Sequence, residues 1–196
     1  MNQPSVGTTL DVQSFINTQP LSRYQWRVVI LCFLIVFLDG LDTAAMGFIA
    51  PALSQDWGID RASLGPVMSA ALIGMVFGAL GSGPLADRFG RKVVLVGAVL
   101  VFGAFSLASA YSTTVDQLLV LRFLTGLGLG AGMPNATTLL SEYTPERHKS
   151  LLVTSMFCGF NLGMAGGGFI SAKLIPAFGW HSLLLIGGIL PLILAG

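Results

Sequence analysis

Apolar residues fill most of this 196-residue chain and form six segments separated by short polar stretches. The segments cover residues 26–50, 64–85, 93–111, 117–140, 150–172 and 182–196. A helix needs about 20 apolar residues to cross a bilayer, and the first five segments have about that length. The sixth stops with the chain after roughly 22 Å of helix. The pattern predicts an all-α integral membrane domain over residues 23–196, with six transmembrane helices of which the last is truncated.

The composition agrees with a chain that lies in lipid. Apolar residues make up 54% of the chain and charged residues 10%, against about 25% charged residues in soluble domains. The 25 glycines suit helices that pack closely in a membrane. The net charge of +1 gives no reason to expect a nucleic-acid partner. We expect Cys32 and Cys158, both within apolar segments, to be buried thiols rather than a disulfide or metal ligands.

The positions of Lys and Arg predict the orientation in the membrane. Cytoplasmic loops are rich in these residues, and one side of the chain has only Arg61 and Lys173. Residues 1–22 are polar and lack the features of a signal peptide, so we expect a cytoplasmic N-terminal segment there. The side that we predict to be cytoplasmic carries seven basic residues: Arg23, Arg27, Arg88, Arg91, Lys92, Arg147 and Lys149.

A charged decapeptide, G-P-L-A-D-R-F-G-R-K at residues 83–92, separates the second and third segments. We expect Gly83 and Gly90 to let the backbone bend, and Pro84 to weaken the helix before the turn. A plain topology signal would need only positive charge, without an aspartate or a fixed spacing. The charged residues that keep this loop in water are Asp87, Arg88, Arg91 and Lys92.

Two aspartates in the first segment are the residues with the highest free-energy cost of placement in a bilayer. Asp39 and Asp42 are three residues apart, so they share one helix face. A charge near the bilayer centre costs at least about 2.5–3.5 kcal/mol, and such residues usually face a cavity or a partner. Two carboxylates on one face repel each other, which favours protonation of at least one. This is the chemistry of a proton-coupled carrier; the alternative is that Asp39 only packs against Arg122 as a structural pair.

Arg122 in the fourth segment lies at the depth of the aspartates. Asp39 is thirteen residues past Trp26, about 20 Å from the cytoplasmic face. Arg122 is six residues past Asp116, about 9 Å from the outer face, or about 21 Å from the cytoplasm in a core about 30 Å thick. We therefore expect Arg122 and both aspartates to occupy one level, with Asp39, Asp42 and Arg122 as proton-coupling candidates. Arg122 is also a substrate-binding candidate: it either binds a substrate carboxylate directly or acts only through the aspartates.

Glycines and two asparagines mark the remaining positions of interest. Glycine pairs 126/130 and 128/132 predict close packing on two sides of the fourth helix, and glycines 159, 163 and 167 predict the same for the fifth. Asn135 and Asn161 either bind a substrate or form hydrogen bonds between helices. No nucleophile–base set or metal-ligand motif accompanies the two histidines, so we do not expect an enzyme.

These motifs resemble those of the major facilitator superfamily. Residues 83–92 match its signature loop G-x-x-x-D-[RK]-x-G-R-[RK] at each specified position. The resemblance implies that this loop is a conformational latch on the second half of the transporter. The pattern R-x-x-x-G-x-G-x-G from Arg122 is similar to the helix 4 motif, whose arginine is implicated in proton transfer. The stretch S-E-Y-T-P-E-R-H-K is similar to the E-x-x-P-x-x-x-[RK] element, with Glu142 and Lys149 at its charged positions.

Two further stretches resemble the aromatic acid:H⁺ symporter family, most closely its bacterial 4-hydroxybenzoate transporters. They are D-G-L-D followed by T-A-A-M-G-F-I-A-P-A-L, and M-P-N-A-T-T-L-L-S-E-Y-T-P. The resemblance covers residues 20–196 and implies symport of a small aromatic carboxylate with a proton across the bacterial inner membrane, driven by the proton gradient without a cofactor. Drug–proton antiporters have Gly-Pro where this chain has Gly163-Met164, which also favours symport.

The resemblance further implies a partner. Such transporters have twelve helices, so the chain corresponds to an N-terminal six-helix half with a 3+3 inverted repeat, and the C-terminal six-helix half is missing. Two alternatives remain open from the sequence. The chain is a truncated, non-transporting membrane protein with a structural or regulatory role, or it belongs to a carrier of another small organic anion.

Overall fold

The first helix shows how the chain begins a long membrane helix. The computed structural model describes residues 21–195, so the predicted N-terminal segment lies almost wholly outside the described residues. Helix α2 (Arg23–Trp57) starts at a capping box, in which the Ser22 hydroxyl accepts from the Gln25 amide at 3.2 Å. The Gln25 side chain accepts from the Ser22 amide at 2.7 Å. Gly58, with φ of 64°, ends the helix in the left-handed conformation that glycine adopts without strain.

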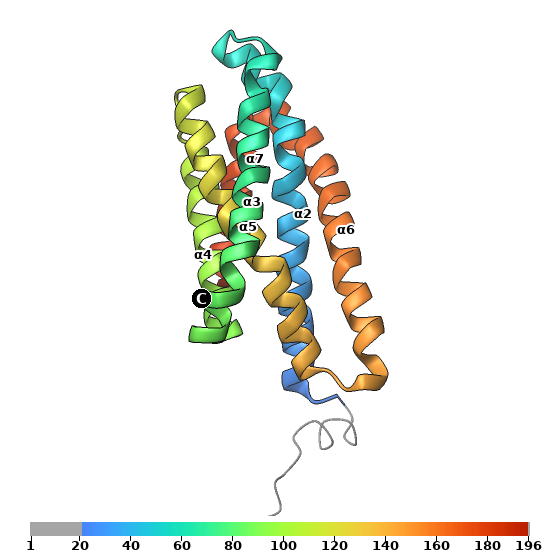
Figure 1. Cartoon of the computed structure of the whole chain (residues 1–196). Helices are drawn as coiled ribbons and strands as arrows, with labels where there is room; N and C mark the ends of the chain where they lie inside the picture. The colour runs from blue at the N-terminus through green and yellow to red at the C-terminus, as the bar shows by residue number, and fades with distance from the viewer. Residues whose placement is uncertain (1–20, 196) are drawn as a thin grey trace, which may run out of the picture.

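The described residues form six α-helices, which Figure 1 labels, and one short 3-10 helix. Five of these helices are long and apolar enough to cross a membrane, and α7 is shorter. The prediction of an all-α membrane fold is therefore confirmed. The helices extend beyond the apolar segments, because a helix ends where capping satisfies its last free backbone groups. This point need not coincide with the last apolar residue. After α2 the elements are η1 (Arg61–Leu64), α3 (Gly65–Phe89), α4 (Arg91–Ser109), α5 (Val115–Tyr143), α6 (Glu146–Phe178) and α7 (His181–Ala195).

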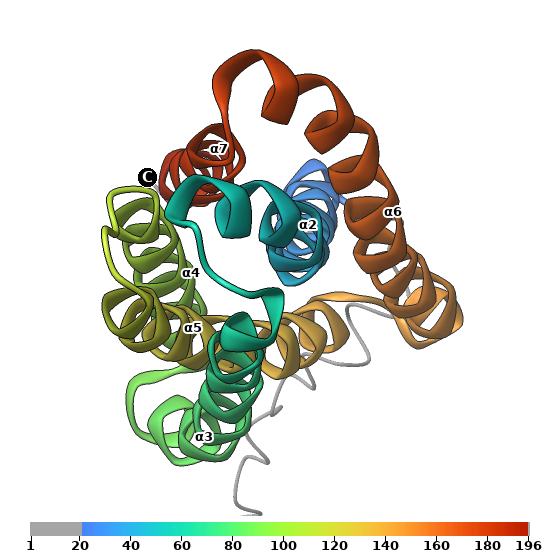
Figure 2. The ribbon, with the colours of Figure 1, turned by 90° about the horizontal axis from the view of Figure 1, so that it is seen from above.

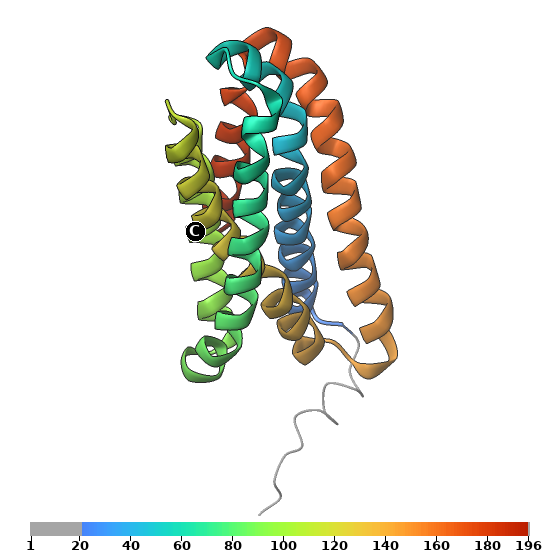
Figure 3. The ribbon, with the colours of Figure 1, turned by 45° about the horizontal axis from the view of Figure 1, so that its top comes forward.

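The helices pack as two groups around α2 and α5 (Figure 2). Helix α2 packs against α6 and α7, whereas α5 packs against α3 and α4, and α4 also packs against α7. Helix α5 crosses the bundle from the α4 side to the start of α2 (Figure 3). There the Gln25 side chain donates to the Tyr143 carbonyl at 2.8 Å, and the rings of Tyr24 and Tyr143 lie 5.8 Å apart. Helices α2 and α5 therefore meet as well.

Glycines let α2 and α6 approach closely. A methyl group added at Gly40 would collide with the backbone of Phe160, and one added at Gly163 would collide with the backbone of Phe37. Small residues at such crossings allow close van der Waals packing, which drives helix association in a membrane. The close packing that we expected for the fifth apolar segment is present at this contact.

Helix α5 uses its two glycine stripes unequally. Gly126 and Gly130 face the backbone of α3, and Gly128 faces the backbone of α4 at Ala98 and Phe102. Packing on two sides of this helix is therefore confirmed. Gly132 contributes little to it, because a Cβ added there would meet no atom within 4 Å.

We predict that Gly40→Ala destabilises the bundle by about 1–3 kcal/mol, because the new methyl group would overpack against α6. The matched control is Gly47→Ala on the same helix, where nothing lies within 4 Å of an added Cβ. Alanine has a helix propensity about 1 kcal/mol more favourable than that of glycine. The control should therefore unfold at a temperature no lower than that of the parent. Thermal unfolding in detergent measures both. Equal midpoints for the two variants would contradict the packing.

The turn between α3 and α4 differs from the prediction. Gly83 and Pro84 lie inside α3, and the single residue Gly90, with φ of 88°, joins Phe89 to Arg91. The expectation that Gly83 bends the backbone was wrong. The charged residues extend α3 by one turn because their side chains are solvated while their backbone keeps its helical hydrogen bonds. The expectation for Cys158 was also wrong, because it is exposed on α6, whereas Cys32 is buried.

Candidate functional site

A buried ion pair joins α2 to α5. The Arg122 guanidinium donates from Nη1 to the Asp42 carboxylate at 3.0 Å, and the two side chains are 1% and 3% exposed. This contact agrees with the common depth that helical rise gives the two residues. A charge buried in apolar surroundings is tolerated when it is paired and hydrogen-bonded. Asp42 and Arg122 fulfil this condition for each other.

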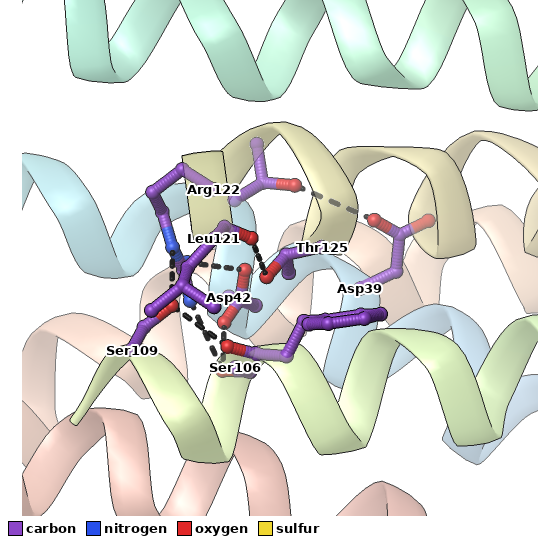
Figure 4. A network of polar contacts seen from close by, with 9 residues as sticks. Asp39, Asp42, Ser106, Ser109, Leu121, Arg122 and Thr125 are labelled. Atoms are coloured by element: carbon purple, nitrogen blue, oxygen red, sulfur yellow. Dashed lines mark hydrogen bonds and ion pairs between the residues drawn. The ribbon is translucent and has the colours of Figure 1, made fainter. Parts of the chain in front are cut away.

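Two serines of α4 complete the network around this pair (Figure 4). The Ser106 hydroxyl donates to Asp42 Oδ1 at 2.7 Å and accepts from Arg122 Nη2 at 3.4 Å. Arg122 Nε donates to the Ser109 hydroxyl at 3.4 Å. Neither serine was predicted from the sequence, although the two lie three residues apart in an apolar segment, the same signal that marked the aspartates.

Asp39 is buried without a cation. Its side chain is 3% exposed, and no Lys or Arg within residues 21–195 forms an ion pair with it. The Thr43 hydroxyl donates to Asp39 Oδ1 at 3.4 Å. A narrow space beside Asp39 is bordered by Gly128 and Gly132 of α5. The alternative that Asp39 pairs with Arg122 is therefore not what the structure shows, because Asp42 occupies that position.

The side chains of the two asparagines contact backbone carbonyls of their own helices. Asn135 is 2% exposed and donates to the Ala131 carbonyl at 2.8 Å. Asn161 is exposed on α6, and its side chain lies 3.5 Å from the Phe157 carbonyl. In the described part of the chain neither amide has a hydrogen bond to another helix, and neither contacts the Asp42–Arg122 pair.

The signature loop contacts the end of α5. Arg91 donates from Nε to Glu142 at 2.7 Å, and both side chains are partly exposed. Lys149 instead lies 3.5 Å from Glu146, one turn earlier on α6. Glu142 and Lys149, the two charged positions of the predicted element, therefore each form an ion pair with another residue in this structure.

The other charged residues of the loop lie toward solvent. The Arg88 guanidinium lies over the Phe89 ring, 5.3 Å from its centre. Asp87 and Lys92 are exposed. Asp87 has no ion pair with another residue of the range 21–195.

A cavity of about 280 Å³ lies between α2, α3 and α5, beside the ion pair. Asp42 and Arg122 both border it, and the rest of its lining is predominantly apolar. Within residues 21–195 no three His, Cys, Asp or Glu side chains converge as metal ligands. The carboxylates of this site can exchange a proton. The guanidinium, which borders the apolar cavity, can bind a small anion.

Comparison with known proteins supports one family. The chain is 92% identical over 193 residues to the 4-hydroxybenzoate transporter PcaK of Pseudomonas putida, covering 98% of the chain and 43% of that protein. It is 56% identical to a gallate transporter of the same species, covering 99% of the chain and 43% of that protein. The chain thus spans less than half the length of these relatives, and it matches their N-terminal part.

The fold agrees with a solved structure at low sequence identity. The inward-open xylose transporter XylE of E. coli superimposes with a TM-score of 0.76 at 20% identity, over 88% of this chain and 47% of that protein. The sequence profile described as Major Facilitator Superfamily matches residues 32–196. The chain therefore belongs to the Major Facilitator Superfamily, of whose fold it covers an N-terminal half.

Proposed function

We propose that the chain is the N-terminal half of a proton-coupled symporter for small aromatic carboxylates such as 4-hydroxybenzoate. The observation that carries this proposal is the buried Asp42–Arg122 pair beside a second buried carboxylate, Asp39, that has no ion pair in the described structure. Intramembrane ionisable groups of this kind mark ion and proton pathways. The relatives named above are transporters of hydroxylated aromatic acids, which supports the choice of substrate.

The ion pair gives a way to couple an anion to a proton. An aromatic carboxylate that reaches Arg122 competes with Asp42 for the guanidinium. Once released, the Asp42 carboxylate is buried without a counter-charge, and taking up a proton removes that cost. Asp39, one helical turn away, holds a proton without breaking an ion pair. Substrate binding and proton uptake then favour each other, as linkage requires.

The remaining candidates have supporting roles in this proposal. Asn135 is buried and donates to a carbonyl of its own helix, and Asn161, which is exposed on α6, is the better placed of the two to meet a substrate between the halves. The proton gradient is the energy source, and no cofactor is needed. The second partner is the C-terminal six-helix half, which faces this one across the substrate pathway, as in other transporters built from two repeats.

Uptake by separate halves tests the proposal. Cells without an aromatic acid transporter would express this chain, the C-terminal half of the P. putida relative, or both. We expect uptake of labelled 4-hydroxybenzoate with both halves only, and its loss when a protonophore collapses the gradient. Uptake of another organic anion but of no aromatic carboxylate would contradict the proposed substrate class. Correctly inserted, associated halves that transport nothing would favour a structural role.

We also propose that the loop at residues 83–92 is a conformational latch, formed by Gly83, Asp87, Arg88, Gly90, Arg91 and Lys92. The exposed position of Asp87 leaves its carboxylate available to the second half. We predict that Asp87→Asn in the full-length transporter lowers uptake at least tenfold while membrane insertion stays normal. Glu146→Gln, an exposed acid on the same side of the bundle, is the control and should keep uptake. Unchanged uptake by Asp87→Asn would reduce the loop to a topology signal.

Labelling from the two sides of the membrane tests the proposed orientation. The seven-to-two division of basic residues supports a cytoplasmic N-terminus in the inner membrane. Single cysteines at Thr113 and Arg88, both exposed, are suitable positions, after Cys158 is replaced by serine. We expect an impermeant maleimide to label position 113 from outside intact cells and position 88 only after permeabilisation. The reverse pattern would contradict the orientation.

A further inference from the structure

The cavity beside the ion pair has a distinctive lining. Three of the seven methionines of the chain border it: Met46 from α2, and Met68 and Met75 from α3. Leu72 and Leu129 add two further large apolar side chains to a lining that also includes the small residues Ala44, Gly47 and Ala71. We call the three methionines and two leucines the methionine pocket. Within the described structure the charged residues on its wall are Asp42 and Arg122. The pocket is therefore apolar on most of its wall and charged on one side.

The size and surface of the pocket suit one aromatic ring. Its volume of about 280 Å³ lies near the lower limit of about 300 Å³ for small-molecule pockets. Methionine side chains are flexible and polarisable, and their sulfur atoms make favourable contacts with aromatic rings, worth about 0.3–1.5 kcal/mol each. A site lined by three of them, from two helices, can make several such contacts with one ring.

The charged side of the pocket can bind a carboxylate. Arg122 uses Nε for Ser109, one Nη1 hydrogen for Asp42 and one Nη2 hydrogen for Ser106. A guanidinium has five N–H donors, so two have no hydrogen bond to the described side chains. A planar guanidinium binds carboxylates well in such geometry. An anion with a ring attached thus finds donors and an apolar surface next to each other.

We infer that the methionine pocket is the subsite for the substrate ring, with the substrate carboxylate at Arg122. The inference rests on the proposed function and names the residues that select an aromatic over an aliphatic acid. It also explains how substrate reaches the proton-coupling pair, because the ring that fills the pocket brings its carboxylate into competition with Asp42. Met68 and Met75 are only half-buried. They are therefore the proposed ring contacts that are best suited to substitution.

Photolabelling combined with kinetics tests this inference in the full-length transporter. The probe is 4-azidobenzoate, whose adduct is located by mass spectrometry. We expect the adduct on α3 between residues 68 and 75, and its loss when excess 4-hydroxybenzoate is present. Met68→Ala and Met75→Ala should each raise KM for 4-hydroxybenzoate by about tenfold. Met75→Leu, which keeps the volume, should recover most of the affinity.

The control variant is Met164→Ala on α6, whose side chain is 38% exposed and does not border the pocket. We expect it to leave KM unchanged, and size-exclusion profiles in detergent to show that all variants are folded. An adduct on other helices, with normal uptake by the parent, would overturn the subsite but leave the proposed function. Absence of uptake of any aromatic carboxylate by the parent would overturn the proposed function and the subsite with it.

Discussion

Arg122→Gln is expected to destabilise the transporter by about 3–5 kcal/mol and to abolish substrate accumulation. The substitution leaves the Asp42 carboxylate, 3% exposed, without its counter-charge. Breaking a buried pair by removing one partner has a cost of this size. The serines of α4 cannot compensate, because a hydroxyl carries no charge. The measurement is thermal unfolding in detergent together with uptake of labelled 4-hydroxybenzoate.

Two further variants show whether the loss comes from the buried pair. Asp42→Asn combined with Arg122→Gln removes both charges, so we expect most of the stability to return while accumulation stays absent. Arg91→Gln breaks the partly exposed pair with Glu142 and should cost at most about 1 kcal/mol. If the double variant were as unstable as Arg122→Gln, the pairing would not explain the loss.

Asp39→Asn is expected to separate coupling from binding. The variant removes one of the two proposed proton-exchanging groups but leaves the Asp42–Arg122 pair intact, so substrate can still reach Arg122. We predict that proton-driven accumulation falls at least a hundredfold while exchange of external for internal 4-hydroxybenzoate continues. Asp42→Asn should abolish both, because it leaves the buried Arg122 guanidinium without a counter-charge and so disrupts the site. Loss of exchange in Asp39→Asn would place this residue in binding instead of coupling.

The sequence predicts the depth of the site but not its pairing. Helical rise alone brings Asp39, Asp42 and Arg122 to one level, and the structure pairs Arg122 with Asp42. The two aspartates differ in direction by about 60° around the helix axis, as 3.6 residues per turn requires. Which of them meets Arg122 depends on how α2 is rotated against α5, and the pattern of one chain segment does not determine this rotation.

Contacts that follow from residue spacing within one helix were predicted, whereas contacts between residues far apart in the sequence were not. Glycine spacing predicts which faces of α5 pack closely, because small residues serve that purpose at any crossing. The partners of Glu142 and of Ser106 lie 51 and 64 residues away along the chain. Such pairs depend on tertiary packing. The methionine pocket was missed for the same reason, since its members come from three helices.

Proton movement in proteoliposomes tests the central claim most directly. Liposomes that contain the full-length transporter and an internal pH indicator would receive external 4-hydroxybenzoate without any imposed pH gradient. We predict rapid internal acidification, well above that of protein-free liposomes, and its loss in the double variant Asp39→Asn/Asp42→Asn. Acidification at the parent rate in that variant would contradict a role for the two aspartates in carrying the proton.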